Sequence, residues 1–179
     1  EDPSLISKFY EKGKIKPKEL MEVTPPSNHY YIMKSHGSSA LGWYNGKTKY
    51  IEKVDKVNAY GIQPKNAEQT FAMHALLNPN ILLTTITGAA GTGKTLLALA
   101  SALEQRSRFK QIYLARPIVP LSNRDIGFLP GDAEAKINPY MQPLWDNLSF
   151  IKHQFKENSK QYKKIDGMIE TDKLRIVPL

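Results

Sequence analysis

The sequence predicts an α/β fold in which a small β-rich module, residues 1–57, precedes a larger three-layer α/β/α core, residues 58–179. Two observations predict this arrangement. From about residue 57 onward, helical and strand-like patterns alternate, which is typical of a parallel sheet covered by helices. Before that point, short apolar segments separated by turn residues predict antiparallel strands.

The predicted N-terminal module consists of a helix, a linker and three strands. Residues 2–11 place apolar side chains on one helical face, and the prolines within residues 12–28 are typical of a linker. Three segments then predict strands: 29–33, 40–44 and 49–54. Asn45-Gly46 separates the last two and predicts a tight hairpin turn.

The predicted core begins with a helix capped by Asn66. Gln69 stands three residues later and completes a capping-box pattern. The apolar stripe expected on this helix is Phe71, Ala72, Ala75 and Leu76. The β-branched run 81–87 and the segment 111–115 predict two parallel strands joined through a helix over 94–106.

The last part of the core is predicted to hold one more helix and one more strand. Asn138-Pro139 predicts a helix start. The residues expected on its buried side are Met141, Leu144, Trp145, Leu148 and Ile151. Residues 174–179 predict a strand.

A glycine-rich loop between the first core strand and the next helix is the most specific pattern in the chain. It fits G-x-x-x-x-G-K-[ST] and consists of Gly88, Ala89, Ala90, Gly91, Thr92, Gly93, Lys94 and Thr95. Glycines let backbone N–H groups turn toward a β-phosphate, and the helix start through Leu96 adds partial positive charge. Lys94 is expected to reach the β- and γ-phosphates, and the Thr95 hydroxyl to bind Mg²⁺. The pattern predicts a P-loop (Walker A) that binds ATP or GTP, although a glycine turn without a ligand remains the alternative.

Two further residues are candidates for ligand contact. Gln69 has an amide that matches an adenine edge, but it serves equally well as part of the capping box. Arg116 ends the second predicted parallel strand, where ligands of open α/β sheets bind, and is a candidate for phosphate or nucleic acid. A surface ion pair is an equally ordinary role for Arg116.

The remaining polar clusters favour structural roles. Residues 126–138 are expected to form a loop in which Asp132 caps a short helix, and the alternative is that a carboxylate or lysine of this loop points toward a ligand. An aromatic and basic mixture is suited to stacking bases, but packing explains it as well: Tyr30, Tyr31, Lys34, Trp43, Tyr44 and Lys47. The four histidines, His29, His36, His74 and His153, share no metal-ligand spacing.

Composition restricts the compartment and the partners. The chain has no cysteine, no long apolar run and no secretory signal pattern at its start, so we expect a cytoplasmic protein with no membrane contact. The net charge is +8, and half of this excess falls in residues 1–65. Alternating lysines at 12, 14, 16 and 18 are consistent with a phosphate-binding arm or with a solvated linker.

One expected component of the site is missing. P-loop enzymes use a strand-end aspartate for Mg²⁺ and a neighbouring acid that orients water, yet no acidic residue here follows an apolar strand. The aspartates of the core fall in predicted loops or helices: Asp125, Asp132, Asp146, Asp166 and Asp172. We therefore expect a fragment whose catalytic carboxylates follow Leu179, and which binds ATP without efficient hydrolysis.

Four motifs in order resemble the PhoH-like ATPases. They are the loop at 88–95, Ala115-Arg116-Pro117-Ile118-Val119-Pro120, the segment 127–132 (GFLPGD) and the segment 139–144 (PYMQPL). The resemblance covers roughly residues 58–179. The N-terminal third looks like the linker and β module of PhoH proteins that carry a PIN ribonuclease domain ahead of it.

The resemblance implies a P-loop NTPase with the RecA-like core of superfamily 1 helicases. It implies ATP and Mg²⁺ as ligands, an adenine-reading role for Gln69, and acidic and arginine motifs beyond Leu179. It also implies single-stranded RNA, a PIN domain and a ring-forming homo-oligomer as partners of the parent protein. A small-molecule kinase and a nucleotide-gated interaction module without turnover remain the rival interpretations.

Overall fold

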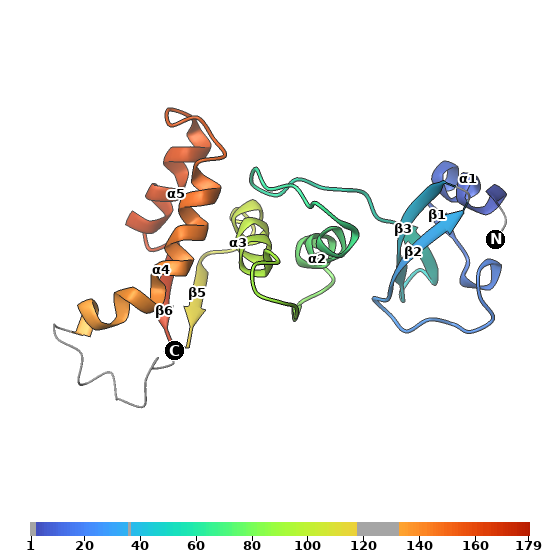
Figure 1. The fold of residues 1–179 in the computed structure, drawn as a ribbon, viewed down its shortest axis with the longest axis horizontal. Helices are drawn as coiled ribbons and strands as arrows, with labels where there is room; N and C mark the ends of the chain where they lie inside the picture. Colours follow the sequence, from blue (N-terminus) through green and yellow to red (C-terminus); the bar gives the residue numbers. More distant parts are fainter. Residues whose placement is uncertain (1–2, 36, 118–132) are drawn as a thin grey trace. The chain divides into compact units, whose positions relative to one another are not determined.

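The computed structural model describes residues 3–35, 37–117 and 133–179, and the chain divides into two compact units (Figure 1). The first unit comprises Glu1–Val57 and Gln63–Leu82, and the second comprises Asn58–Ile62 and Leu83–Leu179. Each unit has its own sheet. No helix in the described ranges combines the length and the apolar character that crossing a membrane requires.

The first unit is built around a four-stranded antiparallel sheet with the order β1-β4-β3-β2. Its elements before residue 57 are α1 (Pro3–Lys12), β1 (Lys14–Ile15), the 3-10 helix η1 (Pro17–Glu19), β2 (Tyr30–Ser35), β3 (Ser38–Asn45) and β4 (Tyr50–Lys53). The predicted helix and three strands are confirmed. The linker prediction for residues 12–28 is wrong in part, because β1 pairs with β4 and η1 follows it.

Helix α1 covers one face of this sheet and forms the core of the unit with it. Ile6 and Phe9 of α1 are buried in one cluster with side chains of the sheet: Ile15, Ala40, Tyr44 and Ile51. Alternate residues of β3 face this core, so Gly42 lies between Ala40 and Tyr44 on the same face. A Cβ at Gly42 would stand 2.7 Å from Ile51 Cγ2, which explains why this strand position lacks a side chain.

The hairpin between β3 and β4 is confirmed, but it is wider than the predicted two-residue turn. Asn45 pairs with Tyr50, so four residues, 46–49, form the connection. Lys49 takes the left-handed conformation with φ 62° and donates its N–H to the Asn45 carbonyl at 2.8 Å. At position 46 the requirement for glycine comes from close packing and not from the backbone conformation. A Cβ at Gly46 would stand 1.9 Å from Ser27 Oγ.

Helix α2 (Ala67–Leu77) packs against the strands of the first unit through an aromatic cluster. Tyr30 Oη lies 2.8 Å from His74 Nδ1, and the Trp43 ring lies 5.1 Å from the His74 ring. Burial raises the pKa of Tyr30 to about 12 and lowers the pKa of His74. Burial therefore favours the neutral forms of both side chains, which share one hydrogen bond.

The predicted start of α2 is confirmed and its predicted stripe is corrected. The Asn66 side chain caps the helix by accepting the Gln69 N–H at 2.8 Å. The buried residues of α2 are Thr70, Met73 and Ala75, and of these only Ala75 belongs to the predicted stripe.

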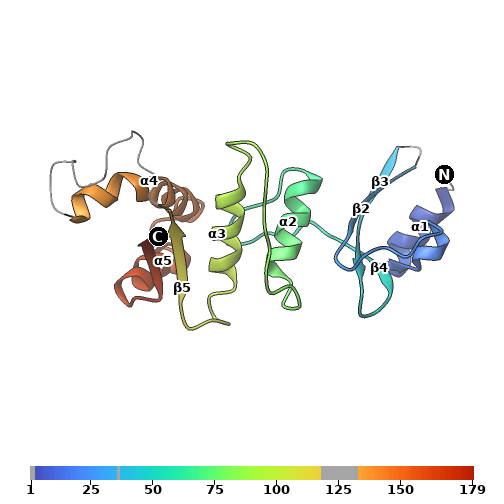
Figure 2. The ribbon, with the colours of Figure 1, turned by 90° about the horizontal axis from the view of Figure 1, so that it is seen from below.

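The second unit combines three helices with a two-stranded parallel sheet (Figures 1 and 2). Its elements are α3 (Lys94–Glu104), β5 (Ile112–Arg116), α4 (Ala133–Lys152), α5 (Lys160–Glu170) and β6 (Leu174–Pro178). The parallel register runs from Ile112 opposite Leu174 to Arg116 opposite Pro178. The predicted helix over 94–106 and the strands at 111–115 and 174–179 are confirmed. The predicted apolar face of α4 is confirmed for Met141, Leu144, Leu148 and Ile151, which are buried. Trp145, the fifth residue predicted for this face, is half-buried.

Two predictions for residues 58–179 need correction, and one helix in this range was not predicted. Residues 81–87 form no strand, because no described segment pairs with them, and Leu82 and Leu83 are 94% and 84% exposed. Helix α4 begins at Ala133, so Asn138-Pro139 lies inside it and residues 133–138 are not a loop. Helix α5 was not predicted, although Tyr162, Ile165 and Met168 follow a helical spacing.

A short turn at residues 58–62 is anchored to the helices of the second unit. Tyr60 donates its N–H to the Glu104 carboxylate at 2.8 Å and its hydroxyl to the Gln161 carbonyl at 2.9 Å. The Arg106 guanidinium lies 4.9 Å from the centre of the Tyr60 ring. This turn therefore belongs to the core of the second unit although the residues on both sides of it lie in the first.

We predict that His74 makes the stability of the first unit depend on pH. Burial lowers the pKa of folded His74 below the ordinary value of 6.5, so the unfolded chain binds more protons at acidic pH. The contribution of neutral His74 to the free energy of unfolding is complete well above pH 6.5 and decreases as the pH falls below this value. Chemical denaturation between pH 7 and pH 5 should show a steeper loss for the wild type than for His74→Gln. His153→Gln, a substitution at an exposed histidine, is the control. An equal dependence of the free energy of unfolding on pH in His74→Gln and in the wild type would contradict the prediction.

Candidate phosphate-binding site

The loop at residues 88–93 turns the chain directly into α3. Gly88, Gly91 and Gly93 all have positive φ, at 148°, 76° and 85°. Residues with a Cβ rarely adopt these angles, so the glycines of the predicted pattern are the ones that the backbone requires. The loop therefore has the backbone curvature expected of a phosphate-binding loop.

The first turn of α3 presents uncapped backbone N–H groups at the end of this loop. Gly93 is the N-cap, it has no side chain to accept a hydrogen bond, and Leu97 N–H is the donor to its carbonyl at 2.9 Å. In the part of the chain that the structure describes, the N-cap residue Gly93 gives the N–H groups of Lys94, Thr95 and Leu96 no side-chain cap. The helix dipole adds partial positive charge there. Such a helix start favours an anion.

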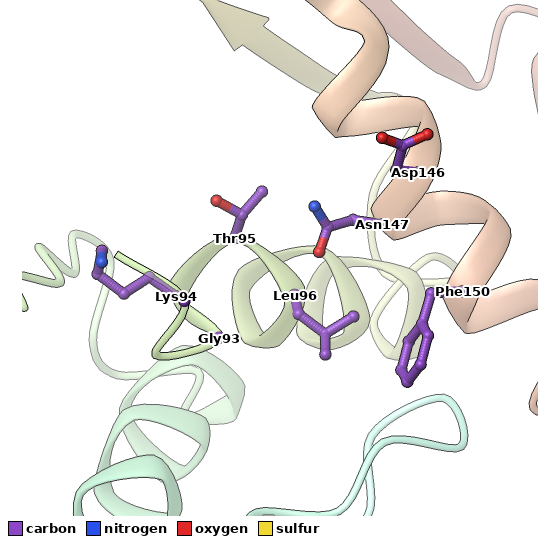
Figure 3. Close-up of a pocket in the computed structure, with 8 residues that line it drawn as sticks. Gly93, Lys94, Thr95, Leu96, Asp146, Asn147 and Phe150 are labelled. Carbon is purple, nitrogen blue, oxygen red and sulfur yellow. The ribbon is translucent and has the colours of Figure 1, made fainter. Parts of the chain in front are cut away.

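Lys94 folds back over its own loop (Figure 3). Its Nζ donates to the carbonyl oxygens of Gly88 at 2.8 Å and Ala89 at 2.7 Å. The Thr92 hydroxyl also lies 3.3 Å from Nζ and itself donates to the Ala89 carbonyl at 2.9 Å. A phosphate that binds Lys94 must therefore replace hydrogen bonds within the loop.

A pocket of about 430 Å³ lies beside the loop, between the start of α3 and the middle of α4 (Figure 3). The residues that line it are Gly91, Gly93, Lys94, Thr95 and Leu96, together with Asp146, Asn147 and Phe150. Thr95 is exposed. The pocket is in the size range of small-ligand sites and joins a cation, a hydroxyl and a carboxylate.

The two polar residues of α4 in this pocket were not predicted as site residues. Gln142 Nε2 donates to Asp146 Oδ1 at 2.8 Å, and Asn147 Nδ2 donates to the Pro143 carbonyl at 2.6 Å. Asp146 and Phe150 stand one helical turn apart, so they share one side of α4. The sequence contains this spacing. It does not contain the information that α4 packs beside the start of α3.

The residues present fit a magnesium–triphosphate group. The uncapped helix start and Lys94 suit phosphate oxygens, and the Thr95 hydroxyl is a ligand type that Mg²⁺ accepts. No group of three or more metal-ligating side chains occurs in the described ranges. This is compatible with Mg²⁺, which keeps several waters and takes oxygen ligands from phosphates with only one or two from protein.

Gln69 and Arg116 occupy ordinary structural surroundings. Gln69 belongs to the first unit, and its Oε1 accepts the Lys65 N–H at 2.7 Å. Arg116 is exposed at the end of β5, and its carbonyl accepts the Leu179 N–H at 3.0 Å. The adenine role of Gln69 and the nucleic-acid role of Arg116 stay predictions.

The other polar candidates are partly explained by packing. Trp43 and Tyr44 are buried at 6% and 2% exposure, so they do not form a stacking surface for bases. Asp166 pairs with Lys152 at 2.6 Å, and Asp172 Oδ1 lies 3.7 Å from Arg175 Nε. Three further candidates, Asp125, Asp132 and His36, lie outside the described residues.

Comparison with known proteins identifies relatives of the whole chain. The family model for PhoH-like proteins matches residues 61–179. A protein named PhoH2 from Bacillus subtilis (strain 168) is 40% identical over 173 residues, which is 92% of this chain and 38% of the relative. A PhoH2 protein from Thermobispora bispora is 27% identical over 174 residues, 96% of this chain and 38% of the relative. No solved structure matches significantly.

The match extends over more than half of the chain, and it includes the glycine loop and the helix that follows it. The chain spans less than two fifths of the length of these PhoH2 relatives. By sequence, the chain belongs to the PhoH-like family of ATP-binding P-loop proteins.

Proposed function

We propose that the second unit binds ATP with Mg²⁺ at the glycine loop. One observation carries the proposal: the pocket brings the uncapped start of α3, Lys94 and Thr95 together at the end of a loop with three glycines in positive φ. The geometry satisfies the needs of a phosphate chain through backbone donors and one cation. Family membership supports the choice of ATP.

Binding rearranges the hydrogen bonds of Lys94. Its Nζ exchanges the carbonyls of Gly88 and Ala89 for phosphate oxygens, which are charged acceptors and bind an ammonium group more strongly. The N–H groups of the α3 start donate to the same phosphate chain. The Thr95 hydroxyl would hold Mg²⁺, and the bound ion would neutralise part of the phosphate charge.

We infer further that the parent protein is an ATP hydrolase directed to RNA, related to helicases and joined to a PIN ribonuclease. The support is the family, the net charge of +8 and the excess of lysine in residues 1–65. A small-molecule kinase and a nucleotide-gated module share the loop. Stimulation of ATP hydrolysis by single-stranded RNA in the parent protein would favour the first function over both others.

We predict that Lys94→Ala weakens ATP binding about ten- to a hundredfold, because a charge-assisted hydrogen bond contributes about 1.5–3 kcal/mol. Isothermal titration calorimetry with ATP and Mg²⁺ measures the change. Lys110→Ala removes the same charge from an exposed position of the second unit and serves as the control. Equal affinities of Lys94→Ala and the wild type would remove the loop from its proposed role.

We predict that Gln69→Ala reduces the preference for ATP over GTP. A site that matches a polar edge rejects an analogue by leaving hydrogen-bonding groups unpaired, and the alanine variant lacks these groups. Competition binding with the two nucleotides measures the preference. Asn66→Ala is the matched control, because it removes the cap of α2, at a cost of about 1 kcal/mol in stability, without changing the amide of Gln69. Loss of stability with unchanged base preference would leave Gln69 a purely structural residue.

We predict that the basic segment after α1 contributes to binding of single-stranded RNA through counterion release. Replacing Lys14 and Lys16 by Gln should lower the slope of log K against log salt by up to about 0.7 for each lysine that contacts phosphate. Fluorescence anisotropy with a labelled oligonucleotide at several salt concentrations measures the slope. Replacement of Lys160 and Lys163 in α5 is the control for net charge. An unaltered slope would identify the segment as a solvated surface.

A further inference from the structure

The phosphate-binding pocket contains a negative charge that the glycine-loop pattern does not explain. Asp146 of α4 lines the same pocket as Lys94 and Thr95, and it is the acidic residue among those that line it. The structure gives Asp146 one hydrogen-bond donor within the described ranges, Gln142 Nε2 at 2.8 Å from Oδ1. This bond orients the carboxylate and leaves it with acceptor capacity for another donor.

A carboxylate beside a phosphate site is unfavourable unless a cation lies between the two. A bound triphosphate carries several negative charges, and Lys94 supplies one positive charge in the pocket. Like charges that share one pocket repel each other. A divalent cation with its shell of water reverses the sign of this interaction, because the carboxylate then accepts hydrogen bonds from metal-bound water.

Other aspartates of the described part of the second unit are arranged differently. Asp166 is paired with Lys152 at 2.6 Å, and Asp172 lies next to Arg175 outside the pocket lining. Asp146 has no such cation in the described ranges, and its helix is fixed by buried side chains, Leu144 and Leu148 among them. Its position is therefore set by the packing of α4 and not by an ion pair.

We propose that Asp146 draws Mg²⁺ to the phosphate-binding loop by holding water molecules of the metal, while Thr95 supplies the direct hydroxyl ligand. This proposal rests on the proposed nucleotide-binding function and deepens it. Asp146 is a positioning residue for the metal, and it is contributed by α4. The Asp146 carboxylate makes nucleotide affinity more dependent on Mg²⁺ than the glycine loop alone would make it.

The test compares Asp146→Asn with the wild type in nucleotide binding with and without metal. Asparagine keeps an oxygen that accepts the Gln142 amide but removes the charge. In the full chain, binding of a non-hydrolysable ATP analogue is measured by calorimetry in EDTA and over a range of Mg²⁺ concentrations. We expect the gain in affinity from Mg²⁺ to fall about tenfold, since loss of an outer-shell partner of a metal has effects of about this size. We expect affinity in EDTA to stay equal or to increase, because a repulsive charge is gone.

Asp172→Asn is the matched control, since it removes the same charge in the same unit from outside the pocket lining. Electron paramagnetic resonance of Mn²⁺ with the analogue gives a second readout, in which Asp146→Asn should bind the ion more weakly. The proposal would be overturned if Mg²⁺ increased the affinity of Asp146→Asn for the analogue by a factor within twofold of that of the wild type. An equal loss of affinity with and without metal would overturn it too, because it would indicate a change of loop structure.

Failure of the proposed function has a different signature. If the wild type binds no nucleotide, or Lys94→Ala binds as the wild type does, the nucleotide site itself is wrong, and the proposal for Asp146 falls with it. If Lys94→Ala is impaired under both conditions while Asp146→Asn shows a normal gain from Mg²⁺, only the role of Asp146 is wrong. Melting temperatures of all variants establish that each one is folded.

Discussion

The candidate site depends on one backbone constraint, the entry of the glycine loop into α3. Three glycines with positive φ bring the chain into the helix at Gly93, where no side chain can cap the first N–H groups. Buried leucines of α3 at positions 97, 99 and 103 hold the direction of these donors. Such a helix start favours an anion, so in the proposed function the main chain supplies much of the affinity for phosphate, and Lys94 adds to it.

The second wall of the pocket follows from the periodicity of α4. Leu144, Leu148 and Ile151 are buried, and this choice of face leaves Asp146, Asn147 and Phe150 along the pocket. A carboxylate therefore stands near a site for anions as a result of helix packing. Under the proposal for Asp146, the same packing favours a phosphate chain that arrives with a metal ion.

In the first unit, an aromatic cluster holds helix α2 against the antiparallel sheet. Tyr30 and Trp43 of the strands contact His74 of α2, and burial keeps both Tyr30 and His74 neutral. The helix that carries Gln69 thus shares a core with the β module, and the chain then returns to the second unit. Gln69, which we propose reads a base, therefore belongs to the first unit. The glycine loop, which we propose holds the phosphates, belongs to the second.

The sequence by itself determined the features that depend on neighbouring residues. These are the glycine loop, the cap at Asn66, the hairpin at Asn45 and most helices and strands, because local backbone preferences and apolar periodicity are written in short segments. Tertiary structure alone decided which segments meet. It paired β5 with β6, left residues 81–87 without a partner among the described residues, and placed Asp146 beside the loop although some fifty positions separate them in the chain. A contact between distant segments depends on the packing of whole elements, and no local pattern encodes it.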